Sequence, residues 1–350
     1  MDKPPFALWL DYCGGIMKQY SDQLEYVRRV CAVTGKEAAL NTEPLGIVGT
    51  DLGIPFSDGD ELYLLFGDTF SKFWQKGRWI NNCIAKVKNA DGENFSIESF
   101  LTDETGLAKE LVAAKKVDKE QMTCIPTGAV AIDGVFYMFV MSIVTWQPRW
   151  TIENCALYIS KDKGQTWQRS KNVVFTKEEA PNLGQIFPFE IGEYVYLFGL
   201  TEARDGACKL ARVPKKELDN FDKYEYYIGK KENIPCFVSG KDGLATIKEN
   251  TDSVVIAAPC GEMCVTYNEY LKKYLAVYIG TDTPDIVYRT ADEPWGEWSE
   301  AQIVALQSDY EGLYGGFTHK MLTKEGGRRV FFMMSEWKPY NVSLFEMKFK

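Results

Sequence analysis

The chain has 350 residues and a net charge of −9, and hydrophobic residues make up 45% of it. That length suits one large all-β domain or two ordinary domains, and the apolar fraction allows a sizeable core. The negative charge and the lack of a long basic run argue against a nucleic-acid partner or an anionic membrane surface, so a neutral ligand is the simpler expectation.

The nine cysteines and the single histidine do not form a metal-binding pattern. There is no CxxC pair, and the most closely spaced cysteines are Cys260 and Cys264. We therefore expect neither a metal nor a cofactor. No apolar run approaches the roughly 20 residues that span a bilayer, and no apolar signal segment is visible at the N-terminus. We expect no membrane partner and a cytoplasmic protein, or a secreted one if the chain is a trimmed form.

Short apolar runs separated by turn residues recur along the whole chain. In order they cover residues 63–66, 135–142, 156–160, 194–200, 253–258, 274–279, 286–289, 330–335 and 343–349. Runs of this length and spacing indicate an all-β sandwich, barrel or propeller. Residues 22–29 and 105–116 have a helical composition, but they do not alternate regularly with the strands, so a βαβ fold is not expected.

Residues 160–167 read SKDKGQTW and match the Asp-box pattern S-x-D-x-G-x-T-W. The pattern predicts a strand–turn–strand unit in which Asp162 bonds turn amides, Gly164 takes a positive φ and Trp167 packs beneath the hairpin. It is typical of β-propellers and similar repeated sheets. We assign it a structural role.

Grouped by spacing, the strands form five sets that cover residues 44–100, 122–176, 183–229, 236–304 and 312–350. Residues 26–34 could add an outer strand to the last set and close the ring, which would seal the sheet edges. We predict a single all-β domain, a five-bladed β-propeller in which each set forms one blade.

Three acids near strand ends are the candidate catalytic residues. Asp51 and Asp68 flank the buried run 62–66, and Glu262 precedes a later apolar strand. Glycoside hydrolysis needs one protonated and one ionised carboxyl group. We expect Asp51 to be the base or nucleophile and Glu262 the acid, with Asp68 either an acid or a group that tunes Asp51. Each could instead cap a turn or begin a strand.

Further polar and aromatic residues near the starts of the sets are expected to bind substrate. Trp146, Arg149 and Trp150 could form a wall that stacks on sugar rings, or could pack between blades. The predicted substrate-binding residues are Trp79, Asn82, Arg149, Trp150, Glu190, Arg204, Asn268, His319, Trp337 and Tyr340.

An ordered series of motifs resembles a family long catalogued as a domain of unknown function. The resemblance covers residues 26–349, and some members of that family are endo-D-arabinanases. The motifs are GTDLGIPF, YLLFGDTF, IPTGAV, KLARVP, YNEYL, IVYRTADEPWGEWSE, YGGFTH and FFMMSEWKPYNV.

The resemblance implies a five-bladed propeller with an acidic central pocket. The family pattern is kept at Asp51, Asp68, Glu262, Asn268 and His319. The chain departs from it at Ile80 and Asn81, at Glu202 and Ala203, and at Lys320, all near the presumed pocket rim. These departures put the identity of the substrate in doubt more than the fold.

Three functions remain open from the sequence. The first is a glycoside hydrolase that cleaves furanosidic linkages in a polysaccharide or oligosaccharide, in the manner of an endo-D-arabinanase. The second is a carbohydrate-binding propeller without catalysis. The third is a scaffold propeller, which would have an apolar channel mouth and no converging acids.

Overall fold

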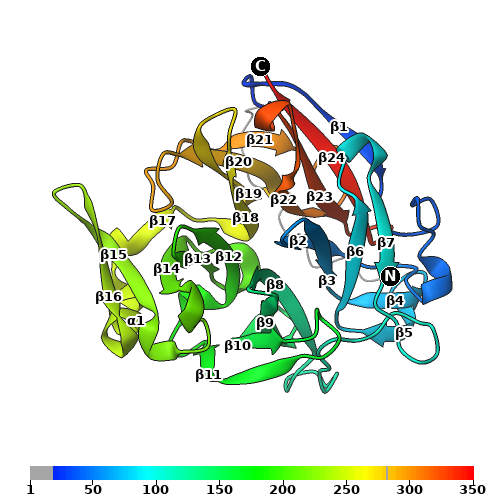
Figure 1. Cartoon of the computed structure of the whole chain (residues 1–350), viewed down its shortest axis with the longest axis horizontal. Coiled ribbons are helices and arrows are strands. Elements are labelled where there is room, and N and C mark those ends of the chain that lie inside the picture. Colours follow the sequence, from blue (N-terminus) through cyan, green and yellow to red (C-terminus); the bar gives the residue numbers. More distant parts are fainter. Residues whose placement is uncertain (1–18, 281–282) are drawn as a thin grey trace.

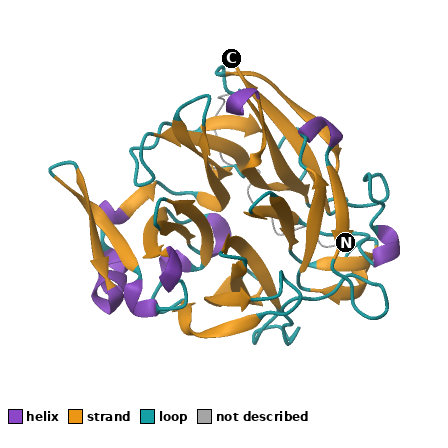
Figure 2. Ribbon diagram, viewed as in Figure 1, coloured by secondary structure: helices purple, strands orange, loops and turns teal. Residues whose placement is uncertain are grey.

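Five small β-sheets stand in a ring around a central axis, which makes the protein a five-bladed β-propeller (Figure 1). The computed structural model describes residues 19–280 and 283–350. Within each sheet the strands follow one another outward from the axis, and neighbours in the sheet are mostly neighbours in the chain. Strands make up most of the ring, with short helices between them (Figure 2). The predicted fold class is confirmed.

The sheets have the following strands, given from the axis outward. The first sheet contains β2 (Leu52–Asp58), β3 (Glu61–Phe66), β6 (Cys83–Asn89) and β7 (Ser96–Phe100), with a separate pair β4 (Thr69–Lys72) and β5 (Lys76–Ile80) beside it. The second contains β8 (Thr123–Ile132), β9 (Val135–Thr145), β10 (Thr151–Ser160) and β11 (Gln168–Thr176). The third contains β12 (Gln185–Ile191), β13 (Tyr194–Leu200), β14 (Cys208–Pro214), β15 (Glu225–Lys231) and β16 (Ile234–Ser239), with β17 (Val254–Ile256) on β14. The fourth contains β18 (Cys260–Asn268), β19 (Lys273–Gly280), β20 (Asp285–Ala291) and β21 (Gln302–Ala305). The fifth contains β22 (Leu313–Lys324), β23 (Arg329–Glu336), β24 (Asn341–Phe349) and β1 (Leu24–Ala32).

The five innermost strands, β2, β8, β12, β18 and β22, contact one another in a closed circle. Four of them carry a register shift near their first residues: at Leu52/Ile54 in β2, Pro126/Gly128 in β8, Cys260/Met263 in β18 and Gly315/Phe317 in β22. A β-bulge interrupts the strict alternation of side chains and redirects one of them. The inner strands can therefore turn more side chains toward the axis than plain alternation allows.

The ring closes where β1 pairs with β24 in an antiparallel register. The carboxylate of Glu346, fully buried on β24, sits between two guanidinium groups. Arg28 of β1 lies 2.6 Å from it, and Arg329 of β23 lies 2.5 Å away. The expected closure by an N-terminal strand is confirmed, and the strand occupies Leu24–Ala32 rather than residues 26–34.

Both segments with helical composition have other structures. Residues 22–29 fall largely within β1. Residues 105–116 form a loop, in which Thr102 bridges to Ala108 and the amides of Leu111 and Val112 donate to the side chain of Asn82. These tertiary hydrogen bonds outweigh the local helix propensity, which is a weak preference on its own.

The third sheet is larger than expected. Strand β16 pairs with β15, and β17 pairs with β14, so the chain stays in this sheet up to Ile256. The start predicted for the fourth set, at residue 236, is therefore too early, because its first strand begins at Cys260. Between β16 and β17 lies α1 (Gly240–Glu249), the one α-helix of the described residues, which packs against β15. Across residues 19–280 and 283–350 no helix has the length and apolarity to cross a membrane.

Residues 160–167 form the turn between β10 and β11. Asp162 accepts from the amide of Thr166 at 2.9 Å and from the hydroxyl of Ser160 at 2.7 Å. Gly164 has φ +84°, and the indole of Trp167 donates to the carbonyl of Gly164 at 3.0 Å. The segment thus stabilises a hairpin at the outer part of the second sheet.

Candidate functional site

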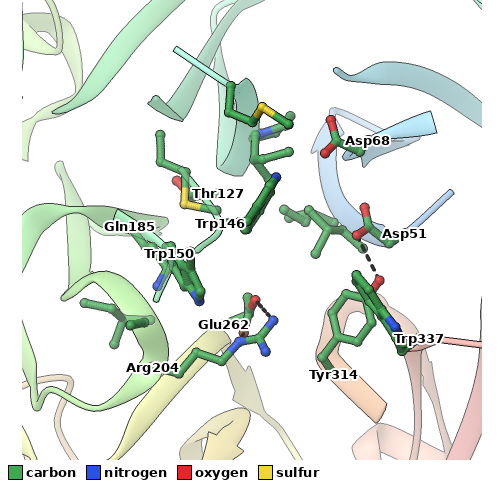
Figure 3. A pocket seen from close by; sticks show the side chains of 18 of the residues that line it. Asp51, Asp68, Thr127, Trp146, Trp150, Gln185, Arg204, Glu262, Tyr314 and Trp337 are labelled. Carbon is green, nitrogen blue, oxygen red and sulfur yellow. Dashed lines mark hydrogen bonds and ion pairs between the residues drawn. The ribbon is translucent and has the colours of Figure 1, made fainter. Parts of the chain in front are cut away.

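A cavity of about 820 Å³ lies on the ring axis, where the five inner strands begin. Each inner strand contributes a lining residue from its first few positions: Leu52, Ile125, Gln185, Glu262 and Tyr314. The volume falls within the range of roughly 300–1,000 Å³ that is usual for small-molecule sites. Figure 3 shows acids, an arginine and several aromatic rings facing this space from different blades.

Asp51 immediately precedes β2 and is held by two tyrosines. Its Oδ2 accepts hydrogen bonds from the hydroxyl of Tyr314 at 2.9 Å and from that of Tyr340 at 2.8 Å. Its Oδ1 is buried and has no partner among the described residues. Burial raises the pKa of Asp51 to about 6, although both tyrosine hydrogen bonds act in the opposite direction. The carboxylate is therefore the main form above that pH.

Gly67 allows Asp51 to take this position. A Cβ atom on Gly67 would lie 2.3 Å from the Asp51 Oδ1, far inside van der Waals contact. The Gly67 amide also donates to the Asp51 carbonyl at 3.2 Å. The glycine in the motif FGDTF is thus required for close approach of the end of β3 to the carboxyl.

Asp68 follows β3 and is nearly fully buried. Its Oδ1 accepts from the indole of Trp79 at 2.8 Å and from the hydroxyl of Thr123 at 2.6 Å. Burial raises the pKa of Asp68 to about 7, and the nearby negative charge of Asp51 adds to the increase. Two neighbouring carboxyls thus have raised pKa values, an arrangement found often at sites of acid–base chemistry.

Glu262 faces the cavity from β18 and is bound by Arg204. The guanidinium donates through Nε to Oε2 at 2.7 Å and through a terminal nitrogen to Oε1 at 2.5 Å. The same guanidinium lies 5.4 Å from the centre of the Tyr314 ring. A continuous set of contacts therefore runs from Glu262 through Arg204 and Tyr314 to Asp51.

Aromatic rings form opposite walls of the cavity. Trp146 and Trp150 lie on one side, with ring centres 6.2 Å apart, and Trp337 lies on the other (Figure 3). Trp337 packs edge-on against Tyr340 at 5.7 Å. Arg149, between the two tryptophans of the first wall, forms an ion pair with Asp205. These walls have the flat apolar surfaces that stack on sugar rings or on other planar groups.

Most of the residues predicted from the sequence meet in this cavity. They are Asp51, Asp68, Glu262, Trp79, Arg149, Trp150, Arg204, Trp337 and Tyr340.

Four other predicted residues lie outside the cavity lining. Asn82 is fully buried, and its side chain donates to the carbonyls of Val112 and Cys124. Glu190 lies near the far end of β12, and its carboxylate is 2.9 Å from Lys215. These two side chains stabilise a loop and an exposed strand surface.

Asn268 and His319 lie too far along their strands to reach the cavity. At about 3.3 Å per residue, His319 is roughly 16 Å beyond Tyr314 on β22. Its Nδ1 accepts from the Met321 amide at 3.2 Å, and burial lowers its pKa to about 3, so the ring is neutral. Asn268 ends β18, and its side chain donates to the carbonyl of Gly327 at 2.8 Å.

Several polar residues that line the cavity or bind its acids were not predicted from the sequence, among them Tyr314, Thr123 and Gln185. Tyr314 is the first residue of YGGFTH, the motif from which His319 was predicted instead. Thr123 and Gln185 begin the inner strands β8 and β12, a position that several of the acids share. Over residues 19–280 and 283–350, no three or more His, Cys, Asp and Glu side chains are grouped to hold a metal.

Comparison with known proteins places the chain among relatives of similar length. The model of the family described as "Domain of unknown function (DUF4185)" matches residues 38–346. Notoamide biosynthesis cluster protein J of Aspergillus sp. (strain MF297-2) is 26% identical over 316 residues, which are 83% of this chain and 80% of that protein.

Solved structures share the fold at low sequence identity. A Bacteroides ovatus protein aligns with a TM-score of 0.55 and 12% identity, over 87% of this chain and 86% of that one. The exo-β-1,3-galactanase of Phanerochaete chrysosporium aligns with a TM-score of 0.52 and 12% identity, over 93% of this chain and 64% of that one. At such identities the likeness concerns the propeller architecture.

Proposed function

The chain belongs to the DUF4185 family, and from this membership and its cavity we propose that the protein is a glycoside hydrolase. One observation carries the proposal: three acids, from two different blades, meet aromatic walls in a single cavity on the ring axis. Two carboxyl groups of different protonation state are what glycosidic cleavage requires. The exo-β-1,3-galactanase with the same architecture is consistent with this chemistry.

Asp51 is the proposed base or nucleophile. The two tyrosine hydroxyls donate to its Oδ2 and stabilise the charged form. With a pKa of about 6, the carboxyl is largely ionised at neutral pH yet remains basic enough to accept a proton. Asp51→Asn should abolish cleavage while leaving the cavity intact.

Asp68 and Glu262 are the two candidates for the general acid. The pKa of about 7 lets Asp68 carry a proton at neutral pH. Glu262 faces the cavity from another blade, as a partner across a scissile bond would, but both of its oxygens accept from Arg204. As an acid it would have to exchange this pair for a proton when substrate binds, whereas Asp68 already has the required state. The one of these two residues that is not the acid shifts the pKa of the other carboxyls in the cavity.

Leaving-group dependence distinguishes the two acids. An enzyme without its general acid cleaves 4-nitrophenyl glycosides, whose leaving group needs little protonation, much better than alkyl glycosides. We expect one of Asp68→Asn and Glu262→Gln to show this selective loss, by about 100-fold or more on the alkyl substrate. Equal losses on both substrates in both variants would remove the acid role from Asp68 and Glu262.

The proposed linkage is furanosidic, as the resemblance to endo-D-arabinanases implies. The test is release of reducing ends from D-arabinan and L-arabinan by the wild type, with Asp51→Asn as the matched inactive protein. Activity on neither arabinan would refute the furanosidic assignment. Inactivity on both arabinans and on a broad panel of aryl glycosides would refute hydrolysis altogether.

A carbohydrate-binding propeller without catalysis is the competing function. The bidentate pair of Arg204 with Glu262 favours it, because that pair occupies a potential acid in the unliganded cavity. Under this alternative, oligosaccharides would bind to the wild type and to Asp51→Asn with similar affinity, and neither would release reducing ends.

A further inference from the structure

Every charged side chain of the cavity lining already has a partner within the chain, although the Oδ1 atom of Asp51 has none among the described residues. A free sugar presents several hydroxyls, and each one that is buried needs a hydrogen-bond partner. All six charged side chains of the lining are already hydrogen-bonded or ion-paired within the protein. The pairs are Asp51 with Tyr314 and Tyr340, Asp68 with Trp79 and Thr123, Glu262 with Arg204, and Asp205 with Arg149.

Two further polar groups of the lining are also engaged. The side-chain amide of Gln185 donates to the carbonyl of Thr201 at 2.9 Å, and the hydroxyl of Thr127 donates to that of Ile186 at 2.8 Å. Ligand hydroxyls would have to compete with these bonds. Many of the other residues that line the cavity are apolar.

One apolar side chain from each inner strand lines the same cavity. These five residues, named here the apolar ring, are Ile54, Ile125, Phe187, Met263 and Phe317. All five are buried, with between 1% and 7% of their surface exposed.

The apolar ring lies further along the strands than the polar residues that precede it. Ile54 follows Asp51 by three positions, and Phe317 follows Tyr314 by three, or about 10 Å of strand at roughly 3.3 Å per residue. Met263 directly follows Glu262. The cavity thus has polar groups at the strand starts and an apolar surface beyond them.

We propose that the apolar ring binds the apolar aglycone of a glycoside, with the sugar held beside the carboxyls. This inference rests on the proposed glycoside hydrolase function and adds glycosides with an alkyl or aryl aglycone to its substrate class. The side chains of the five ring residues contact a ligand without forming hydrogen bonds to it.

The test measures binding of straight-chain 1-alkanols, from butanol to octanol, by titration calorimetry. Alkanols carry no sugar, so the result does not depend on the linkage or on cleavage. Each methylene buried in the ring should tighten binding about fourfold, until the chain fills the available length. No dependence of affinity on chain length would overturn the inference.

Two variants locate the binding surface. Met263→Gln introduces an amide of similar length into the apolar ring and should weaken octanol binding at least 10-fold. Met321→Gln makes the same exchange at a partly buried position on β22 outside the cavity and should leave the affinity unchanged. Equal affinity of the wild type and Met263→Gln for octanol would place the alkanol elsewhere and overturn the inference. If Met263→Gln does not fold, the dependence of wild-type affinity on alkanol chain length is the measurement that tests the inference.

The outcome separates this inference from the proposed function. Chain-length-dependent binding without any glycosidase activity would leave the apolar ligand site standing and refute the hydrolase. Cleavage of arabinan without measurable alkanol binding would support the hydrolase and refute the apolar ligand site. If both hold, hexyl arabinofuranosides should be cleaved with a higher kcat/KM than methyl arabinofuranosides.

Discussion

Replacing Tyr340 by phenylalanine should raise the pKa of the Asp51 carboxyl. The substitution keeps the ring, which packs against Trp337 and Phe70, and removes only the hydroxyl that donates to Asp51 at 2.8 Å. A hydrogen bond to a charged group contributes about 1.5–3 kcal/mol, and one pKa unit corresponds to about 1.4 kcal/mol. Loss of this bond should therefore raise the pKa from about 6 by roughly one to two units.

Carbon-13 NMR of aspartate carboxyls measures this shift without any substrate. Spectra of Asp51→Asn assign the resonance, and titration from pH 4 to 9 gives the pKa in the wild type and in Tyr340→Phe. Tyr63→Phe is the matched control, because its hydroxyl donates to Glu61 at 3.0 Å, outside the cavity lining. If the protein cleaves glycosides, the acidic limb of kcat/KM should move by the same amount.

An unchanged or lowered pKa of Asp51 in Tyr340→Phe would refute this reasoning. It would mean that the hydroxyl does not stabilise the charged carboxylate. A shift of equal size in Tyr63→Phe would point instead to a general change in the protein.

Three further predictions concern the same cavity. Burial raises the pKa of Asp68 from 3.8 to about 7, so its contribution to stability is complete below pH 4 and is lost as the pH rises through 7. The free energy of unfolding should therefore fall by on the order of 1 kcal/mol per pH unit, and Asp68→Asn should flatten this decline in thermal unfolding. Equal slopes in both proteins would contradict the prediction. Gly67→Ala would bring a Cβ to 2.3 Å from the Asp51 carboxyl and should change its NMR titration. Gly59→Ala strains a turn at φ +57° but places its Cβ in open space, so it should leave that titration unchanged; identical titrations in both variants would show that the close approach is unimportant. Arg204→Met should lower the free energy of unfolding in urea by about 3–5 kcal/mol, because it leaves the buried carboxylate of Glu262 unpaired. Arg149→Met removes an ion pair that is half exposed and should lower it by less than about 1 kcal/mol. Similar losses in the two variants would contradict the assigned burial.

The architecture was predictable because its signals are local and repeated. Short apolar runs such as residues 63–66 and 194–200 each predicted one strand, and residues 26–34 predicted the closing strand. The end of the third sheet was harder to predict, because β16 and β17 continue this sheet beyond residue 229. Residues 105–116 were assigned the wrong structure because their loop depends on hydrogen bonds that its amides donate to Asn82, which lies outside the segment in the sequence.

Residues of the cavity were predictable where they lie at the ends of strands or in the turns beside them. Asp51 and Glu262 were found because each stands beside an apolar run that ends or begins there. His319 and Asn268 lie on the same inner strands as site residues but several positions further along, a difference that motifs alone do not convey. Tyr314 was missed because the motif YGGFTH directed the prediction to His319, five positions further along the same strand.

Closure of the ring by β1 has a consequence for the order of folding. Arg28 and Glu346, which join β1 to β24, are 318 residues apart in the chain. During synthesis on the ribosome, β1 emerges early and has no partner until almost all of the polypeptide has followed. Contacts of such long range slow folding and leave an open strand edge exposed to other nascent chains in the meantime. Truncation that removes β24 should therefore release the N-terminal strand as well as the last blade.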